Sequence, residues 1–350
     1  MRNKKVAVAM SGGVDSSLTA ALLLERGFEV VGVTMLLSES GGERSCCSSS
    51  EVEDARAVCQ HLEIRHYVAD FREIFRDKVE NYFVAEYLSG RTPNPCVRCN
   101  REIKFGRLFE FAQDLGADYL ATGHYARIIF EEGRFKLKKA VDERKDQSYV
   151  LYNLTAEKLS RILLPLGEFS KSETRRLAEE KNLPVAHKPD SQEICFVPNN
   201  DYKKFISSRC RGAQALKSGN IVDASGKILG HHNGIANYTI GQRKGLGISN
   251  PTPLYVTRLD ALKRRVIVGS NSELFSDDLR AENVQWIYKP QNPATLGAKI
   301  RYGAKISACE VFEEGNLLRV KFFEAQRAIT AGQSIVFYAG EEVLGGGTII

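Results

Sequence analysis

The sequence lacks any long apolar run. Its longest apolar stretches, such as residues 6–10 and 20–24, fall far short of the roughly 20 residues that a membrane-spanning helix needs. The N-terminus is basic, but no signal-peptide apolar region and no small-residue cleavage site follow it. We therefore expect a cytoplasmic protein with no membrane partner.

Cysteine is also scarce. Eight cysteines in 350 residues are too few for a disulfide scaffold, and in a reducing compartment such cysteines are catalytic, metal-binding or simply buried. A hydrophobic share of 43% and a charged share of 26% exclude an intrinsically disordered chain. The net charge of +6 permits a polyanionic partner such as nucleic acid without requiring one.

Two common nucleotide-binding motifs are missing. The Walker pattern ending in Gly-Lys-Ser/Thr is absent, which argues against a kinase or GTPase, and the absence of Gly-x-Gly-x-x-Gly weakens a nicotinamide enzyme. What is present is a Ser-Gly-Gly-Val-Asp-Ser-Ser turn over residues 11–17, between a predicted strand and a predicted helix. Such a turn exposes backbone N–H groups at a helix N-terminus and predicts an anion site, although a plain serine-capped glycine turn is the simpler alternative.

Strand and helix patterns alternate through the first 125 residues. Strands are expected over 5–9, 29–35, 65–68 and 119–122, with helices over 16–26, 51–62 and 101–115, which predicts a doubly wound parallel α/β sheet. A hairpin over 127–130 and 136–139 follows, and Ser170 with Glu173 predicts a capping box for a helix to about 181. Beyond about residue 210 short alternating segments over 263–268, 298–302, 317–323 and 334–338 predict all-β structure. The expected domains are 1–205, 206–272 and 273–350.

Cys96 and Cys99 form a Cys-x-x-Cys pair ahead of a predicted helix. The pair has three interpretations: half of a zinc site, a redox pair, or a nucleophile with a neighbour. Neither a second Cys-x-x-Cys nor a paired histidine is present, so the interpretation as a nucleophile with a neighbour is favoured. This interpretation needs a partner elsewhere in the chain, and Cys195, in a predicted turn, is the best candidate. A helix start nearby should lower the pKa of these thiols. Cys59, Cys210 and Cys309 fit structural positions, and Cys46 and Cys47 sit in a polar loop with no visible partner.

Basic residues gather beside the cysteine pair. Arg101, Lys104 and Arg107 recur every three residues and are expected on one side of the helix. A solvated face would explain the pattern, but its position favours contact with a phosphate backbone.

At family level the chain resembles the bacterial tRNA-specific 2-thiouridylases, the MnmA family, from end to end. The matching segments cover residues 10–17, 90–95, 99–105, 121–125, 145–149, 194–196, 239–248 and 345–347. The resemblance implies an N-terminal domain of the ATP-pyrophosphatase type, a small central domain and a C-terminal β-barrel. It also implies that ATP adenylates the C2 oxygen of uridine 34 in glutamate, glutamine and lysine tRNAs, and that a persulfide sulfur then replaces this oxygen.

The same resemblance assigns roles to residues. Cys195 would carry the persulfide, and Cys99 would release its sulfur by forming a disulfide with Cys195 or would act as the nucleophile. ATP would be bound by Ala9, Met10, Ser11, Gly12, Gly13, Val14, Asp15, Ser16, Met35 and Gly123, with Asp15 helping to hold Mg²⁺. The target base would face Asn94, Pro95 and Cys96, and the tRNA would contact Lys145, Asp146, Gln147, Arg301 and Tyr302. The expected sulfur donor is a cysteine desulfurase, acting directly or through a relay protein.

Position 96 departs from the family pattern. Better-known members carry Asp there, able to act as an acid or base, whereas this chain has Cys96. Together Cys96, Cys99 and Cys195 could instead ligate a 4Fe–4S cluster with one iron open, as proposed for related tRNA thiolases. A different ATP-pyrophosphatase synthetase and a tRNA-binding module with structural ATP are the remaining alternatives.

Overall fold

The computed structural model describes residues 3–38, 49–190 and 194–350, so Cys46 and Cys47 lie outside the described residues. The chain forms two compact units: the first comprises Met1–Glu80, Pro95–Asn200 and Glu341–Leu344, and the second comprises Asn81–Asn94, Asp201–Gly340 and Gly345–Ile350. The expected boundaries near 205 and 272 stay predictions. In the described part of the chain, no helix is both long enough and apolar enough to cross a membrane.

A parallel sheet of five strands forms the centre of the first unit, which confirms the predicted α/β fold. Its spatial order is β3 (Arg65–Asp70), β2 (Glu29–Leu36), β1 (Lys5–Ala9), β4 (Tyr119–Ala121) and β7 (Ile162–Leu163). Val6 lies opposite Val30 on one side and opposite Tyr119 on the other. The strands β2 and β3 are added on one side of β1, and β4 and β7 are added on its other side. Open α/β sheets bind ligands at such a reversal of strand order, beyond the carboxyl ends of the strands.

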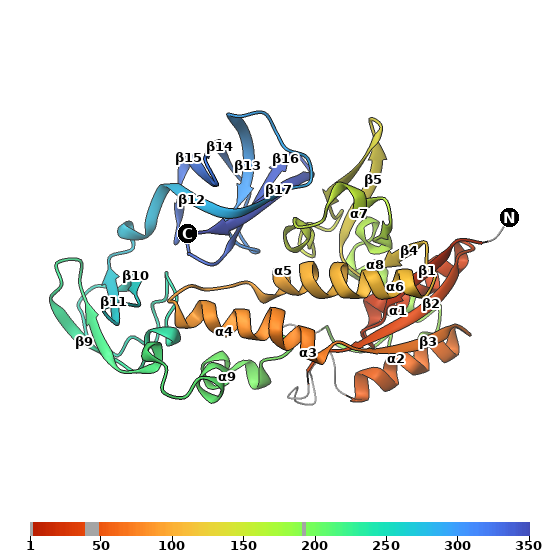
Figure 1. Ribbon diagram of the computed structural model, residues 1–350, viewed down its shortest axis with the longest axis horizontal. Coiled ribbons are helices and arrows are strands. Elements are labelled where there is room, and N and C mark those ends of the chain that lie inside the picture. Colours follow the sequence, from red (N-terminus) through yellow and green to blue (C-terminus); the bar gives the residue numbers. More distant parts are fainter. Residues whose placement is uncertain (1–2, 39–48, 191–193) are drawn as a thin grey trace. The chain divides into compact units, whose positions relative to one another are not determined.

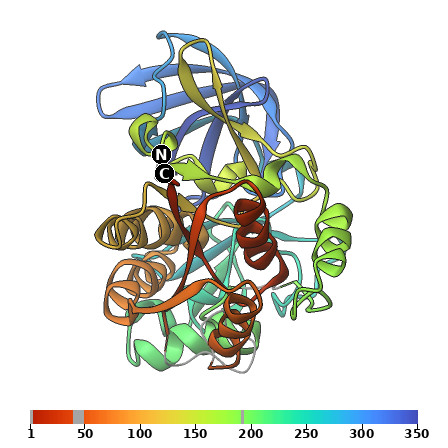
Figure 2. The same ribbon diagram turned by 90° about the vertical axis from the view of Figure 1, so that its right-hand side faces the viewer.

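Helices lie on both sides of these strands (Figure 2). They are α1 (Val14–Glu25), α2 (Ser49–His61), α3 (Arg72–Phe75), α5 (Pro95–Cys99), α6 (Leu108–Asp114), α7 (Ala156–Leu159) and α8 (Lys171–Glu180), with π-helical segments at Arg76–Glu80 and Asn100–Arg107. In Figure 1, α5 and α6 belong to one continuous helical rod. The rod begins at Pro95, earlier than the predicted 101, because proline is well suited to the first turn of a helix.

Local sequence signals define two further features of this unit. The predicted hairpin is confirmed as β5 (Ala126–Glu131) and β6 (Arg134–Lys139), joined by Glu132 and Gly133, both with positive φ as a two-residue hairpin turn requires. The capping box of α8 is also confirmed, since the Ser170 side chain accepts from the Glu173 N–H while the Glu173 side chain accepts from the Ser170 N–H.

The second unit is mainly β-structure, as predicted. It contains α4 (Asn81–Leu88) and α9 (Tyr202–Arg209), together with a four-stranded sheet in the order β10 (Tyr255–Asp260), β11 (Arg265–Gly269), β8 (Gly219–Val222) and β9 (Ile228–His232). Six further strands follow in the order β12 (Phe275–Trp286), β15 (Leu317–Arg327), β14 (Ser307–Glu314), β13 (Ala294–Lys299), β16 (Ser334–Ala339) and β17 (Glu342–Ile349). Because β12 also pairs with β17, the six strands close into a barrel.

The bounds predicted for the strand over 298–302 are wrong, because the observed strand begins and ends earlier in the sequence. β13 spans Ala294–Lys299, and Arg301 and Tyr302 fall in the turn that follows it, where the Ala304 N–H donates to the Arg301 carbonyl. The apolar residues that face the barrel interior, among them Ala298, Cys309 and Val320, decide where each strand lies.

Candidate active site

The glycine–serine turn lies at the carboxyl end of β1, as predicted. Gly12 has a φ of +70°, and a Cβ atom there would stand 2.4 Å from the Glu51 carbonyl oxygen of α2. Gly13 is the N-cap of α1 and supplies no capping side chain. The first N–H groups of a helix without a side-chain cap can bind an anion.

Other predicted nucleotide residues converge on this turn. Gly123 follows β4, the neighbour of β1, and a Cβ atom there would stand 2.9 Å from both the Asp15 carbonyl carbon and the Ser16 nitrogen. Met35 lies near the carboxyl end of β2, on the other side of β1. The structure therefore brings the turn and Gly123 into direct contact and places Met35 at the same edge of the sheet.

Asp15 is the start of a chain of charges. Its Oδ1 atom accepts hydrogen bonds from Lys171 Nζ at 2.7 Å and from the Tyr125 hydroxyl at 2.9 Å. Lys171 Nζ also lies 2.9 Å from Asp190 Oδ1. Asp190 in turn pairs with Lys145 at 2.9 Å and with Arg175 at 2.6 Å. Burial alone would raise the pKa of Asp190, but hydrogen bonds from Lys171 and Lys145 hold it below its usual value.

A second ion pair joins the segment before Cys195 to the same turn. Lys188 Nζ donates to the Gly12 carbonyl at 3.1 Å and lies 2.6 Å from Asp54 Oδ2. Nearby Glu51 is buried, and burial raises its pKa to about 7 although the charge of Lys188 acts in the opposite direction. Lys188 therefore contacts the nucleotide turn directly, and Asp190 is linked to it through Lys171.

The three predicted cysteines influence one another. Cys99 is buried, which raises the pKa of its thiol to about 12; Lys104 lowers that pKa, and Cys195 and Cys96 raise it. Cys96 reaches solvent, yet the protein around it desolvates the thiol and raises its pKa, with Cys195 adding to the effect. The thiols of Cys96, Cys99 and Cys195 thus lie within electrostatic range of each other.

The expectation of a lowered thiol pKa is wrong. It assumed that the pair stands just ahead of a helix, whereas Cys96 and Cys99 lie within α5 and Cys99 is its last residue. At that position the helix N-terminus is too far away to stabilise a Cys99 thiolate. Desolvation therefore outweighs the charge of Lys104 and raises the pKa. Cys195 is partly exposed, and the next residue, Phe196, is buried against Phe75 with ring centroids 5.5 Å apart.

The expected basic face beside the cysteines is divided. Arg101 is exposed and pairs with Glu102, and Arg107 pairs with Glu110. Lys104 instead lies 3.4 Å from His124 Nε2, and the other ring nitrogen of His124 lies 2.6 Å from Thr122 Oγ1. The segment is π-helical, so residues three apart do not line up as they would on an α-helix.

His124 is held neutral beside this lysine. Burial, and then the charge of Lys104, lower the pKa of its imidazole well below the usual value. A neutral ring that accepts from Lys104 at Nε2 carries its proton on Nδ1 and donates it to Thr122. His124 and Lys104 were not predicted as a pair; the Thr-Gly-His-Tyr segment after β4 was the available signal.

The expected tRNA contacts occupy different environments. Lys145 reaches partly into solvent, but Asp146 is buried and accepts from the Ala140 and Ser148 N–H groups at 3.1 Å each, so it shapes its own turn. Gln147 accepts from the Tyr125 N–H at 2.9 Å. In the second unit, Arg301 and Tyr302 are both exposed.

Asn94 ends a segment that is fixed within the second unit. Arg91 pairs with Glu86 at 2.9 Å and with Glu282 at 3.0 Å. The Thr92 N–H donates to the Ala331 carbonyl at 2.8 Å, and Gln333 Nε2 donates to the Thr92 carbonyl at 2.8 Å. Arg91 therefore has a structural role in the second unit, and hydrogen bonds hold the backbone just before Asn94 in place.

The metal expectations differ in how well residues fit them. Mg²⁺ is commonly held by one or two carboxylates together with nucleotide phosphates, and Asp15 at the turn suits that role. Within residues 3–38, 49–190 and 194–350, no three Cys, His, Asp or Glu side chains are grouped so that they could hold a metal ion. Cys96, Cys99 and Cys195 do not form such a group, and their ligation of an iron–sulfur cluster stays a prediction.

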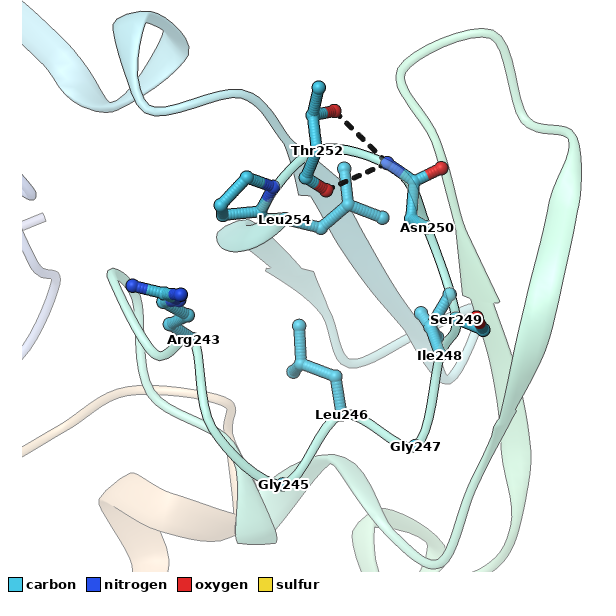
Figure 3. A pocket seen from close by; sticks show the side chains of 10 residues that line it. Arg243, Gly245, Leu246, Gly247, Ile248, Ser249, Asn250, Thr252 and Leu254 are labelled. Atoms are coloured by element: carbon cyan, nitrogen blue, oxygen red, sulfur yellow. Dashed lines mark hydrogen bonds between the residues drawn. The ribbon is translucent and has the colours of Figure 1, made fainter.

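The second unit has a cavity of its own. This open cavity has a volume of about 450 Å³, and its wall runs from Arg243 to Leu254 and includes Gly245, Leu246 and Gly247. In Figure 3, Arg243 lies at one end and the Asn250 side chain is held by Thr252, with Nδ2 donating to the Thr252 carbonyl at 2.8 Å. The cavity belongs to the Gln-Arg-Lys-Gly-Leu-Gly segment that matches the family pattern.

Known proteins resemble this chain over nearly its whole length. Residues 4–199 match the tRNA methyl transferase HUP domain, 203–270 the tRNA methyl transferase PRC-barrel domain and 276–349 the aminomethyltransferase beta-barrel domain. Among solved structures, the U34-tRNA thiolase NcsA from Methanococcus maripaludis with its [4Fe-4S] cluster is 19% identical over 60% of this chain and 66% of that one. Its TM-score of 0.37 is too low to support a conclusion about chemistry.

Curated relatives are much more similar. The tRNA-specific 2-thiouridylase MnmA of Carboxydothermus hydrogenoformans is 53% identical over 357 residues, which cover 99% of this chain and 97% of that protein. The protein of the same name from Clostridium acetobutylicum is 49% identical over 355 residues, which cover 99% of both chains. Identity at this level over full length shows that the chain belongs to the tRNA-specific 2-thiouridylase family, MnmA.

Proposed function

We propose that this protein is an ATP-dependent tRNA-uridine 2-sulfurtransferase that converts the wobble uridine of glutamate, glutamine and lysine tRNAs to 2-thiouridine. The observation that carries the proposal is identity of about 50% to 2-thiouridylases along the whole chain. The charged glycine–serine turn and the three mutually influencing thiols supply the two chemical functions that such a reaction needs.

ATP would bind at the turn between β1 and α1. The N–H groups at the start of α1 would hold phosphate oxygens, and Asp15 would help to hold Mg²⁺. When bound, Mg²⁺ neutralises phosphate charge. The C2 oxygen of uridine would attack the α-phosphorus and pyrophosphate would leave, which converts a poor leaving group into AMP.

Sulfur would then pass from Cys195. The terminal sulfur of a Cys195 persulfide would bond to C2 as the bond from C2 to the AMP oxygen breaks. Cys99 would give up its thiol proton to the released AMP and attack Sγ of Cys195. The sulfur–sulfur bond of the persulfide then breaks, its electron pair remains with the sulfur on C2, and a Cys99–Cys195 disulfide forms. A reducing thiol of the cytoplasm would restore both cysteines, and a cysteine desulfurase or relay protein would reload Cys195.

The tRNA would contact both units. We propose that Asn94, Pro95 and Cys96 face the target base and that Lys145, Gln147, Arg301 and Tyr302 contact the rest of the tRNA, with Asp146 acting through the turn that it shapes. Because Asp146 is buried, its contribution would be to shape the turn that presents Lys145 and Gln147. A base held for chemistry must leave its stack, and loops over a basic surface provide such a site.

The test is sulfur transfer in vitro with tRNA, Mg-ATP, cysteine and a cysteine desulfurase. Cys99→Ser and Cys195→Ser should each lose 2-thiouridine formation at least a thousandfold while still adenylating tRNA, because each removes a thiol that no other side chain replaces. Cys309→Ser, in the barrel core of the second unit, is the matched control for loss of a thiol and should retain sulfur transfer. Thiolation surviving in Cys195→Ser would contradict the proposal and direct attention to Cys96.

A further inference from the structure

The nucleotide turn contains no lysine of its own, but Lys171 from another part of the chain contacts it. Sequence motifs that bind β- and γ-phosphates usually carry a lysine within the loop, and residues 9–17 contain none. In the fold, the first residue of α8 brings an ammonium group to this place, since Lys171 Nζ lies 2.7 Å from Asp15 Oδ1. A residue more than 150 positions away thus supplies the charge.

The packing of α8 fixes where this ammonium group can be. Ala178 of α8 and Leu183 just beyond it share a buried cluster with Leu18 and Leu22 of α1. The start of α8 is held by its capping box and by the Lys171 N–H, which donates to Asp142 Oδ2 at 3.2 Å. The Lys171 side chain is only 12% exposed. Little conformational freedom is left for Lys171 to lose when a ligand binds.

The charges around Lys171 favour an additional anion. Lys171, Arg175 and Lys145 all contact the one carboxylate of Asp190, and Asp15 provides the second negative charge. These three cations and their carboxylate partners lie beside the N-terminus of α1, whose N–H groups also favour an anion. A lysine ammonium has three donors, and the two carboxylates engage it at 2.7 and 2.9 Å.

We propose that Lys171 binds the β- and γ-phosphates of ATP, and that Asp15 and Asp190 are the counter-ions that it exchanges for phosphate oxygens. The inference rests on the proposed function for the identity of the nucleotide. Asp190 lies five residues before Cys195 in the sequence, and its Oδ1 atom, 2.9 Å from Lys171 Nζ, occupies a donor that a phosphate oxygen would otherwise take. The contact of Lys171 with the phosphates stabilises the negative charge that the leaving pyrophosphate acquires.

The experiment compares ATP with AMP on the full-length protein by isothermal titration calorimetry in the presence of Mg²⁺, without tRNA or a sulfur donor. AMP has no β- or γ-phosphate, so the ratio of the AMP to the ATP dissociation constant isolates the contact. In Lys171→Met this ratio should fall by about tenfold to a hundredfold, with AMP binding unchanged, as expected for loss of a charge-assisted hydrogen bond.

The control is Lys181→Met, which removes a lysine at the opposite end of α8 that pairs with Glu25, and it should leave the ratio unchanged. Asp190→Asn keeps the shape of the side chain but removes a competing carboxylate, so it should tighten ATP binding and leave AMP binding unchanged. A structural role alone would not strengthen binding, so this variant also decides the case if Lys171→Met fails to fold.

An unchanged ratio in Lys171→Met, an equal loss of ATP and AMP binding, or ATP binding in Asp190→Asn that is unchanged or weaker would overturn the inference. These outcomes differ from failure of the proposed function, which would appear as wild-type protein that forms no 2-thiouridine in the sulfur-transfer assay. Wild-type protein that binds ATP no better than AMP would also overturn the inference.

Discussion

Close backbone contacts decide which residue types the nucleotide turn and its neighbours can accept. Gly123 shows this most clearly, because its φ is not in the left-handed region and its constraint is steric. Gly123→Ala would put a Cβ atom 2.9 Å from backbone atoms of Asp15 and Ser16. We expect ATP binding to weaken by at least about tenfold as the start of α1 is displaced.

Calorimetric titration with ATP is the measurement. The control is Gly303→Ala, where a Cβ atom would have no neighbour within 4 Å, and its ATP affinity should equal that of the wild type. Wild-type affinity in Gly123→Ala would show that the turn tolerates the displacement.

Glu51 gives a prediction for pH. Burial raises its pKa from 4.5 to about 7 in the folded protein, so the folded state holds this proton more tightly than the unfolded state does. The stability from this group is therefore fully present below about pH 4.5 and is lost as the pH rises through about 7. Glu51→Gln should raise the free energy of unfolding at pH 8 by roughly 1–3 kcal/mol, and the gain should disappear near pH 4.

Urea unfolding at the two pH values tests this expectation. Glu53→Gln, on the same helix but exposed, should show no such dependence on pH. A Glu51→Gln variant that is less stable than the wild type at pH 8 would mean that the ion pair with Lys188 outweighs the cost of burial.

At the scale of elements, α8 connects local sequence to the site. Its capping box is readable from Ser170 and Glu173, yet the importance of the helix comes from Lys171 at its first position. Ser170→Ala removes one cap and should lower the free energy of unfolding by about 1 kcal/mol. Because the cap fixes the start of α8, ATP binding should also weaken, by less than in Lys171→Met.

Far-UV circular dichroism in urea and ATP titration are the two measurements. Ser160→Ala removes a hydroxyl that donates only to the nearby Glu157 carbonyl and is the control. Unchanged stability and ATP affinity in Ser170→Ala would contradict the link between the cap and the site.

The rod from α5 to α6 shows where element prediction was least accurate. Its sequence suggests one amphipathic α-helix after the cysteine pair, but the structure begins the helix at Pro95 and contains π-helical turns over Asn100–Arg107. Those turns direct Lys104 toward His124 and Cys99 and leave Arg101 exposed. Intrinsic propensity does not distinguish π from α geometry, so tertiary contacts decide the direction of these side chains.

At the scale of the whole molecule, the nucleotide turn and the barrel core belong to different units. The nucleotide turn lies in the first unit, and the barrel core with Trp286 lies in the second. Leu318→Ala removes a buried side chain from the barrel core and should destabilise the second unit by about 2–5 kcal/mol. The dissociation constant of ATP should stay within about twofold of the wild type, because none of the turn residues is in that unit.

Trp286 is the only tryptophan, so its fluorescence in urea reports unfolding of the second unit. Leu262→Ala changes a side chain that is 97% exposed and is the matched control. A large loss of ATP affinity in Leu318→Ala would show that the units depend on each other for folding.

The sequence by itself determined the parallel α/β sheet, the mainly β second part, the hairpin, the α8 capping box and the glycine–serine turn. All of these depend on local signals: periodicity, turn residues and caps within a few positions of one another. The buried positions of Cys59 and Cys309 were predicted for the same reason and are confirmed.

Only the tertiary structure decided what surrounds the site. Lys171 and Lys188 reach the turn from segments far along the chain, and Asp190 is linked to it through Lys171. Gly123 meets the turn because β4 pairs with β1. The same holds for the pKa of Cys99, where burial among distant residues outweighs the local helix. Desolvation and ion pairing depend on neighbours in space, and periodicity along the chain carries no information about which distant side chains those neighbours are.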